Sequence, residues 1–169
     1  MRIHTLNFGD LEIAQDTVIT FKDGLPGFPR LRHFAILEME ELKPFNYLQS
    51  LPEASPESVN EPPIALYLIN PFLVDPGYEF RLTDSDMEDI HSKNSAELTV
   101  YAVATIPESP KDATLNLMAP IVINERDRCG KQVILHDSKY SVRHPLLGGS
   151  TPAGEPYGKP DEVSPSLLG

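Results

Sequence analysis

The run from Thr114 to Asn124 constrains the fold more than any other stretch of the chain. Successive side chains of a strand point to opposite faces, so alternate apolar residues are expected to share one buried face. Here the odd-numbered positions are all apolar: Leu115, Leu117, Ala119, Ile121 and Ile123. Pro120 has no N–H for a sheet ladder, so it indicates an edge, a bulge or a bend between two short strands.

A turn and a second apolar run follow directly. Residues 125–130 are turn-like and residues 131–135 are again rich in apolar side chains, so the whole stretch predicts a β-hairpin. Gly130 is expected to supply a positive φ at the end of the turn. Asn116 and Asn124 interrupt the apolar pattern, and we interpret them as residues that hydrogen-bond to turn or backbone groups.

The rest of the chain repeats short, strand-like segments separated by turns. Seventeen prolines argue against a helical bundle. One helix is expected from about Asp84 to His91, because Thr83 and Asp86 have the spacing of a capping box. It would bury Met87 and Ile90. The other expected strands cover residues 2–6, 11–13, 17–21, 33–37, 44–50, 64–69, 78–82 and 98–106.

These elements predict an all-β, mainly antiparallel domain, either a small barrel or a sandwich, with one short helix, over residues 1–147. The Pro-rich residues 51–63 are expected to form an exposed, mobile loop. Residues 148–169 contain five Gly and four Pro, and we expect them to form a disordered tail.

The charge and composition bound the possible partners. Fourteen basic and 25 acidic residues give a net charge of -11, which repels phosphate backbones, so direct binding to nucleic acid is not expected. No apolar stretch approaches the roughly 20 residues that span a bilayer. Cys129 is the single cysteine, so no intrachain disulfide can form. With an N-terminus unlike a signal peptide, these features favour a cytoplasmic protein without a membrane partner.

The sequence carries no recognised pattern for catalysis, a cofactor or a metal. Gly-rich phosphate loops, nucleophile elbows and zinc-protease motifs are all absent. Cys129 lies in a hydrophilic turn, and the eight-residue separation of His136 and His144 is no recognised metal spacing. The acidic start of the expected helix lacks a calcium loop's glycine and final glutamate, having Asp89 and Ser95 there instead. We therefore expect no enzyme. A hydrolase using His136 or His144 and a small-molecule-binding β-barrel remain alternatives.

A set of short motifs, in collinear order over about residues 1–147, resembles the flagellar assembly factor FliW family. Each motif is weak alone, and their combination is specific. They are Gly24–Phe28, Pro44–Phe45 with Leu48–Ser50, Asn70–Phe72, Tyr78–Phe80, Thr105–Pro107, Asn116–Asn124, Gly130–Leu135, and Tyr140 with Arg143–Leu146. The Pro-rich stretch 51–63 is longer than expected for the family, and the tail after Leu147 is extra.

The resemblance implies a cytoplasmic adaptor, monomeric on its own, without catalytic activity or a cofactor. Members of the family bind newly made flagellin near its C-terminal helical region. They also bind the RNA-binding translational regulator CsrA and antagonise it without occupying its RNA site. Secretion of flagellin frees the adaptor to sequester CsrA, so flagellin translation rises.

For contacts with these partners, we expect two regions: the Asn70–Val74 turn and the hairpin from Ile123 to Val133. Apolar groups beside turns make good interface anchors. The candidate residues are Asn70, Phe72, Leu73, Val74, Ile123, Arg126, Arg128 and Val133. The alternative is that Phe72 and Ile123 simply belong to the core.

Overall fold

The computed structural model describes residues 1–5, 8–136 and 138–147. The expected tail at 148–169 lies outside these residues. The strands are β1 Arg2–Thr5, β2 Gly9–Glu12, β3 Ile19–Phe21, β4 His33–Glu38, β5 Asn46–Ser50, β6 Ala65–Ile69, β7 Thr99–Thr105, β8 Thr114–Asn124, β9 Cys129–Gln132 and β10 His144–Pro145. Helix α1 spans Asp84–Asp89, and short 3-10 turns are η1 Gln15–Thr17, η2 Glu40–Leu42, η3 Pro52–Ala54, η4 Pro71–Leu73, η5 Ser95–Glu97 and η6 Pro110–Asp112.

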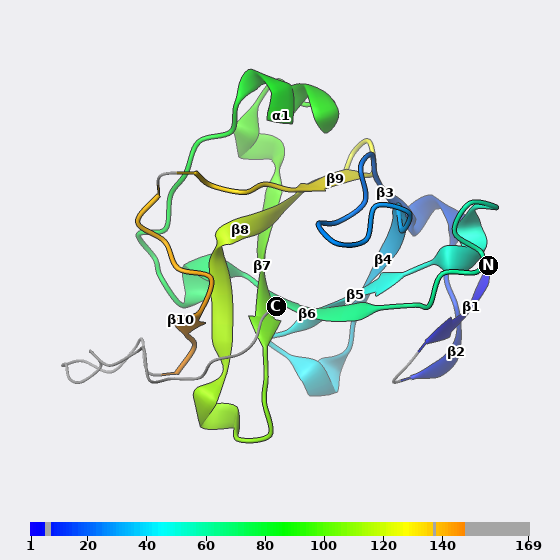
Figure 1. The fold of residues 1–169 in the computed structure, drawn as a ribbon, viewed down its shortest axis with the longest axis horizontal. Coiled ribbons are helices and arrows are strands. Elements are labelled where there is room, and N and C mark those ends of the chain that lie inside the picture. Colours follow the sequence, from blue (N-terminus) through cyan, green and yellow to red (C-terminus); the bar gives the residue numbers. More distant parts are fainter. Residues whose placement is uncertain (6–7, 137, 148–169) are drawn as a thin grey trace.

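Strands β3 to β9 close into a seven-stranded barrel (Figure 1). Neighbours along the order β8-β7-β6-β5-β4-β3 are antiparallel, β3 pairs with β9 in parallel, and β9 returns to β8. β10 adds to the free edge of β8, and β1 and β2 form a separate hairpin. The expected all-β, mainly antiparallel fold with one short helix is confirmed, and of the two expected architectures the barrel is observed.

The barrel interior is filled by side chains. Phe21 and Phe34 meet edge to face with their ring centroids 5.0 Å apart, and residues from all the larger strands surround them. The buried set is Ile19, Phe21, Leu25, Leu31, Phe34, Leu48, Leu68, Val103, Ile121 and Ile123. Burial of this apolar surface is the main stabilising contribution of the barrel.

Strand β8 is bent, so its five odd-numbered apolar residues do not share one face. Ile121 pairs with Tyr101 of β7, whereas Leu115 pairs with Ala104, and the register shifts between these pairs. Ile121 and Ile123 therefore face the interior. Leu115 and Leu117 pack on the outer side, in a cluster with Tyr78, Ala102 and Ala104. The prediction of a single buried face was wrong.

The side chain of Asn116 holds this bend, because its Oδ1 accepts hydrogen bonds from the N–H groups of Met118 and Ala119, both at 3.0 Å. Between Asn116 and Ile121, where the pairing of β8 with β7 is interrupted, the backbone of β8 bonds to the residues that follow β9. Val133 donates to the carbonyl of Pro120, and Leu135 donates to that of Met118. The predicted backbone role of Asn116 is thus confirmed, and Pro120 marks the bulge.

Two local expectations were wrong. Residues 78–82 form no strand; they run extended across the outer side of β7 and β8, where the Tyr78 hydroxyl donates to the carbonyl of Leu117 at 2.7 Å. The positive φ of the hairpin turn belongs to Arg128, at 56°, and not to Gly130. Gly130 is needed for space, because a Cβ there would lie 2.7 Å from the Phe21 ring.

Helix α1 begins as expected and ends two residues early. Thr83 Oγ1 accepts from the Asp86 N–H and Asp86 Oδ2 accepts from the Thr83 N–H, both at 3.0 Å, which is the predicted capping box. Ile90 is fully buried and Met87 is half-buried. None of the helices in the described part of the chain has the length and apolar character needed to cross a bilayer.

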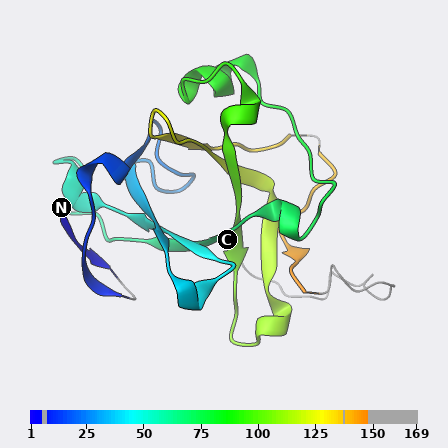
Figure 2. The same ribbon diagram turned by 180° about the vertical axis from the view of Figure 1, so that it is seen from behind.

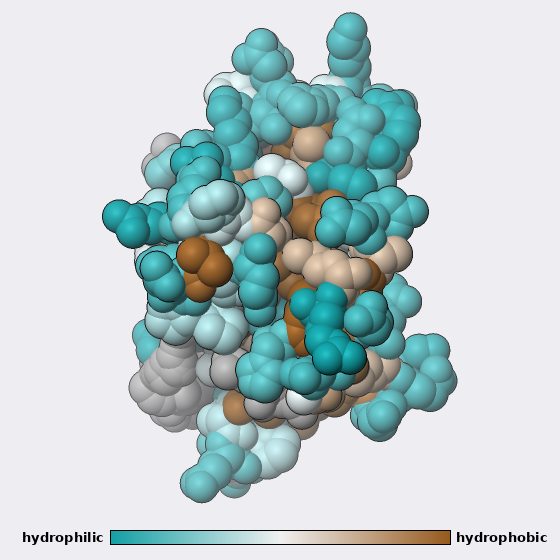
Figure 3. Space-filling view, turned by 90° about the vertical axis from the view of Figure 1, so that its right-hand side faces the viewer, coloured by the Kyte–Doolittle hydropathy of each residue, from teal (hydrophilic) through white to brown (hydrophobic). Residues whose placement is uncertain are grey.

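The Pro-rich loop at 51–63 is only partly exposed. Leu51 and Ser58 are buried, and the Ser58 hydroxyl donates to the carbonyl of Pro52 at 2.9 Å, so the loop folds down onto the barrel. Nearby, the β1–β2 hairpin covers the outer side of β4 and β5 through a cluster that includes Ile3, Leu37 and Tyr47. Figure 3 views this side, which is mainly hydrophilic with a broken band of apolar side chains.

Candidate partner-binding surface

The turn η4 displays two large apolar side chains. Asn70 Oδ1 accepts a hydrogen bond from the Phe72 N–H at 2.9 Å and so caps the turn. The buried Pro71 is the first residue of the turn, where its fixed φ is favourable. Both residues therefore restrict the conformation of η4. Phe72 is consequently 41% exposed and Leu73 63% exposed, while Val74 packs inward against the cluster around Tyr78. Exposed apolar groups on a rigid turn suit an interface anchor.

Phe72 is one of the residues that line a groove of about 600 Å³ with both apolar and polar side chains. One wall is the extended segment 78–83, part of the chain that climbs from η4 to α1 in the view from behind (Figure 2). The other wall is the segment 93–98, and the floor comes from β7 and β8. The apolar lining residues are Phe72, Phe80, Leu82, Met87, Leu98, Val100 and Val122.

The rim of this groove is more basic than the chain as a whole. Arg81 and Lys93 both line it and are exposed, and Glu79 is the single carboxylate among its lining residues. Across the described ranges, neither Arg81 nor Lys93 lies within ion-pair distance of a carboxylate. In a chain of net charge -11, two cations at this groove without an ion-pair partner in the described ranges are available to an acidic ligand.

The turn of the β8–β9 hairpin is anchored to α1. The Asn124 amide donates to the carbonyls of Ile90, at 2.8 Å, and His91, at 3.2 Å, and its oxygen accepts from the Arg126 N–H at 3.1 Å. The predicted backbone role of Asn124 is therefore confirmed. Arg126 reaches Glu97 of η5 at 3.4 Å, so this turn adjoins the 93–98 wall of the groove.

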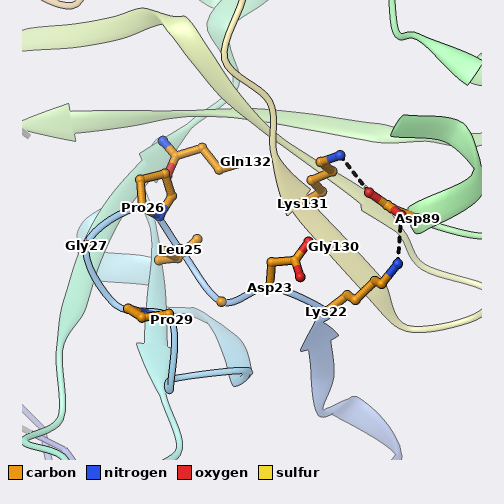
Figure 4. Close-up of a pocket in the computed structure, with 11 residues that line it drawn as sticks. Lys22, Asp23, Leu25, Pro26, Gly27, Pro29, Asp89, Gly130, Lys131 and Gln132 are labelled. Carbon is orange, nitrogen blue, oxygen red and sulfur yellow. Dashed lines mark hydrogen bonds and ion pairs between the residues drawn. The ribbon is translucent and has the colours of Figure 1, made fainter. Parts of the chain in front are cut away.

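A second, smaller hollow of about 310 Å³ lies under the loop that follows β3 (Figure 4). The loop is closed by two backbone hydrogen bonds between Leu25 and Phe28. Gly24 has φ +67°, and a side chain there would collide with the carbonyl oxygen of Phe28 and lie 2.9 Å from Pro29 Cα. The Gly24–Phe28 motif thus folds a tight cover over the β3–β9 seam.

An ion network lines this pocket, and Figure 4 shows Asp89 of this network between Lys131 and Lys22. Lys131 Nζ lies 2.8 Å from Asp86 Oδ1 and 2.7 Å from Asp89 Oδ2, and Lys22 Nζ lies 3.1 Å from Asp89 Oδ1. The side chains of Asp86, Asp89 and Lys131 are largely buried, whereas that of Lys22 is 67% exposed. The network ties α1 to β9 and to the loop after β3.

The charges of the network shift one another's pKa values. Burial alone would raise the pKa of Asp86, but hydrogen bonds from Lys131 and Thr83 bring it below its usual 3.8. The hydrogen bond from Lys131 lowers the pKa of Asp89 more than burial raises it, with help from Lys22. Burial would lower the pKa of Lys131, and the two carboxylates raise it above 10.5 instead. All three groups are therefore charged at neutral pH.

The two regions expected to contact partners differ in what they expose. In the turn, Asn70, Phe72 and Leu73 are exposed and Val74 is half-buried; in the hairpin, Arg126 is exposed and Arg128 half-buried. Ile123 and Val133 are buried, at 0% and 5% exposure, and pack in two separate core clusters. For Ile123 the structure agrees with the core alternative; for Phe72 it does not.

Sequence reasoning missed the groove itself. Its floor and rim include Phe80, Arg81, Leu82, Lys93 and Leu98, which were not among the candidates. These residues come from two segments more than ten positions apart, and only the fold brings them beside η4. The alternation of residues 78–82 was the available signal, and it was interpreted as a strand.

The polar side chains weighed for catalysis are poorly placed for it. Cys129 Sγ lies 3.4 Å from His91 Nδ1, but burial and the charge of Asp127 raise the pKa of the thiol, so it stays protonated. His136 is exposed, and burial lowers the pKa of His144 despite the charge of Asp75. Throughout residues 1–5, 8–136 and 138–147, no three His, Cys, Asp or Glu side chains are grouped to hold a metal.

Comparison with known proteins gives a consistent match. A family model described as "FliW protein" matches residues 2–146. The flagellar assembly factor FliW of Geobacillus kaustophilus is 38% identical over 147 residues, or 87% of this chain and 96% of the relative. That of Bacillus subtilis is 36% identical over 150 residues, or 89% and 99%. That of Thermosipho africanus is 34% identical over 144 residues, or 85% and 94%.

The fold agrees with this match. A crystal structure of the flagellar assembly factor FliW superposes with a TM-score of 0.76 at 36% identity, covering 86% of this chain and 96% of that one. The closed barrel, the motif order and the matched length thus point to one relationship. The chain belongs to the FliW protein family.

Proposed function

We propose that the protein is a non-enzymatic flagellar assembly factor that acts as a chaperone-like adaptor. It binds flagellin in the cytoplasm and, as the alternative partner, the translational regulator CsrA, which it antagonises by protein–protein contact. The observation that carries this proposal is the kinship over residues 2–146 with proteins of matching length that are named flagellar assembly factors.

The surface is compatible with this role. Phe72 and Leu73 stand exposed on a rigid turn, as anchors of a protein interface do. The net charge of -11 disfavours contact with RNA itself and favours approach to a basic RNA-binding protein such as CsrA. The adaptor would therefore act on the regulator and not on the message.

Coupling between flagellin level and translation follows from mass action. When two partners cannot bind one adaptor at the same time, their concentrations and affinities set the ratio of the two complexes. A difference of about 1.4 kcal/mol in binding free energy changes this ratio tenfold at equal concentrations. Accumulated flagellin would release CsrA to repress translation, and secretion of flagellin would reverse this.

The test is a calorimetric titration of the purified protein with CsrA, first alone and then with saturating flagellin from the same organism. We expect saturable binding of CsrA alone and its loss when flagellin is present. Circular dichroism on the same sample shows that the barrel is folded. A folded protein that binds neither partner would contradict the proposal.

The alternative of a small-molecule-binding barrel required an apolar cavity inside the barrel. The interior instead holds ten buried residues in one cluster, which includes the ring contact between Phe21 and Phe34. Such packing leaves the barrel wall, and not its lumen, as the place for recognition.

A further inference from the structure

Two buried polar atoms on the outer side of the barrel have no hydrogen-bond partner among the residues that the structure describes. They are Oε1 of Gln49, in β5, and Nδ1 of His33, in β4. Buried polar groups in folded proteins are almost always paired with a protein group or an ordered water. We infer that one ordered water molecule bridges these two atoms at the base of the Pro-rich loop 51–63.

The sheet register makes Gln49 and His33 neighbours on the same face. Gln49 pairs with Ala35, and the Leu51 N–H donates to the His33 carbonyl at 2.8 Å, so His33 lies diagonally across from Gln49. Ala35, Leu37 and Leu51, which share this alternation, pack in the cluster on the outer side. Diagonal neighbours in an antiparallel pair are about 7–8 Å apart, a span that two long side chains and one water can bridge.

The Gln49 amide has one favourable orientation. Its Nε2 donates to the carbonyls of Ser50, at 3.1 Å, and Ile64, at 3.4 Å, which are the residues at the two ends of the loop. A flipped amide would place its oxygen against these two carbonyl oxygens, which only accept. Gln49 is 0% exposed, so its Oε1 has no access to bulk water and needs a donor inside the protein.

The His33 ring lies between this site and a surface pocket. It lines the pocket, of about 350 Å³, together with Arg32 and Glu57, while its Nδ1 is buried. A neutral ring with its proton on Nε2, the nitrogen that is not among the buried unpartnered atoms, presents Nδ1 as an acceptor. Two acceptors, Nδ1 and Gln49 Oε1, cannot bond to each other, whereas a single water has two protons to donate to them.

The first experiment detects the water by nuclear magnetic resonance of the full chain. A buried water stays in place longer than the protein takes to tumble, so we expect cross-peaks between water and the Gln49 side-chain amide. These cross-peaks should have opposite signs in the laboratory-frame and rotating-frame spectra, which excludes proton exchange as their source. The amide of Gln15, which is exposed on η1, is the control and should show no such pair of cross-peaks.

The same sample gives the tautomer of His33. Long-range proton–nitrogen correlation spectra identify which ring nitrogen carries the proton, and we expect Nε2. His33→Phe keeps an aromatic ring and removes Nδ1, so it should lose the water cross-peaks of Gln49. His136→Phe is the matched control, because His136 is exposed and its replacement should leave these cross-peaks unchanged. Circular dichroism verifies that each variant is folded.

Three results would overturn the inference: no long-lived water at the Gln49 amide of the wild-type chain, cross-peaks that persist in folded His33→Phe, or a His33 proton on Nδ1, which could donate to Gln49 Oε1 directly. The first and the third are measured on the wild-type chain, so they test the water site even if His33→Phe fails to fold. None of the three bears on partner binding, so the proposed function would stand in each case.

Discussion

The two hollows that flank α1 differ in whether their cations are paired with carboxylates and whether their apolar side chains are buried. Asp89 of α1 lines the pocket under the loop after β3, and Met87 lines the groove beside η4. In the pocket, Lys131 and Lys22 are paired with carboxylates, and Leu25 is buried. In the groove, Phe72 is exposed and the rim cations lack partners within the described residues.

This difference separates residues that hold the fold from residues available to a partner. The Gly24–Phe28 motif is conspicuous in the sequence, yet it serves to cover the β3–β9 seam. The Asn70–Phe72 motif uses its first two residues for the turn and exposes the third. Changes in the pocket and core should therefore lower stability, and changes in the groove should lower binding.

The largest effect is expected from Ile123→Ala. Ile123 is fully buried in the barrel core, so its truncation should lower the free energy of unfolding by about 2–5 kcal/mol. Urea denaturation measures this, with Phe72→Ala as the contrast, expected to change stability by less than about 1 kcal/mol. If the two variants lost stability equally, the division between core and partner surface would fail.

A smaller loss is expected from Gly24→Ala in the cover loop. The added Cβ meets the backbone of Phe28 and Pro29 at a positive φ, so the free energy of unfolding should fall by about 1–3 kcal/mol. Gly77→Ala is the control, because its nearest contact would be 3.7 Å, an ordinary van der Waals distance. Thermal denaturation measures the loss of stability in both variants, and we expect the loss to be larger for Gly24→Ala than for Gly77→Ala.

The ion network contains one largely buried lysine and one exposed lysine, so it allows the contributions of a buried and an exposed ion pair to be compared. Lys131→Met leaves Asp86 and Asp89 largely buried without their main partner, and should destabilise the protein by about 1–3 kcal/mol. Lys22→Met removes an exposed partner of the same Asp89 and should cost less than about 1 kcal/mol. Equal losses in chemical denaturation would mean that burial does not distinguish these two lysines.

The smallest expected effect is a loss of stability in acid. Asp86 and Asp89 have folded-state pKa values below their usual 3.8, so the unfolded chain binds more protons as pH falls through this range. Their contribution is complete well above pH 3.8 and is lost as pH falls through the lower folded pKa values. Denaturation at several acidic pH values measures the slope, which should be shallower in Lys131→Met; an unchanged slope would count against the network.

Local sequence signals predicted much of the fold. The capping box at Thr83, the backbone roles of Asn116 and Asn124, and most strands depend on neighbours within a few positions, which the sequence displays directly. The motif order also indicated the family. The candidate site was predicted only in part: the exposed turn at Phe72 was found, whereas Ile123 and Val133 were candidates that the fold buries.

By itself, the sequence determined most of the short strands, the capped helix that begins at Asp84, the backbone roles of Asn116 and Asn124 and the strongly acidic balance, because each follows from local geometry or composition. Only the tertiary structure decided the bend of β8, the pairing of Lys131 with Asp86 and Asp89, and the groove between segments 78–83 and 93–98. Each of these joins residues far apart in the chain, and their meeting depends on how the barrel closes.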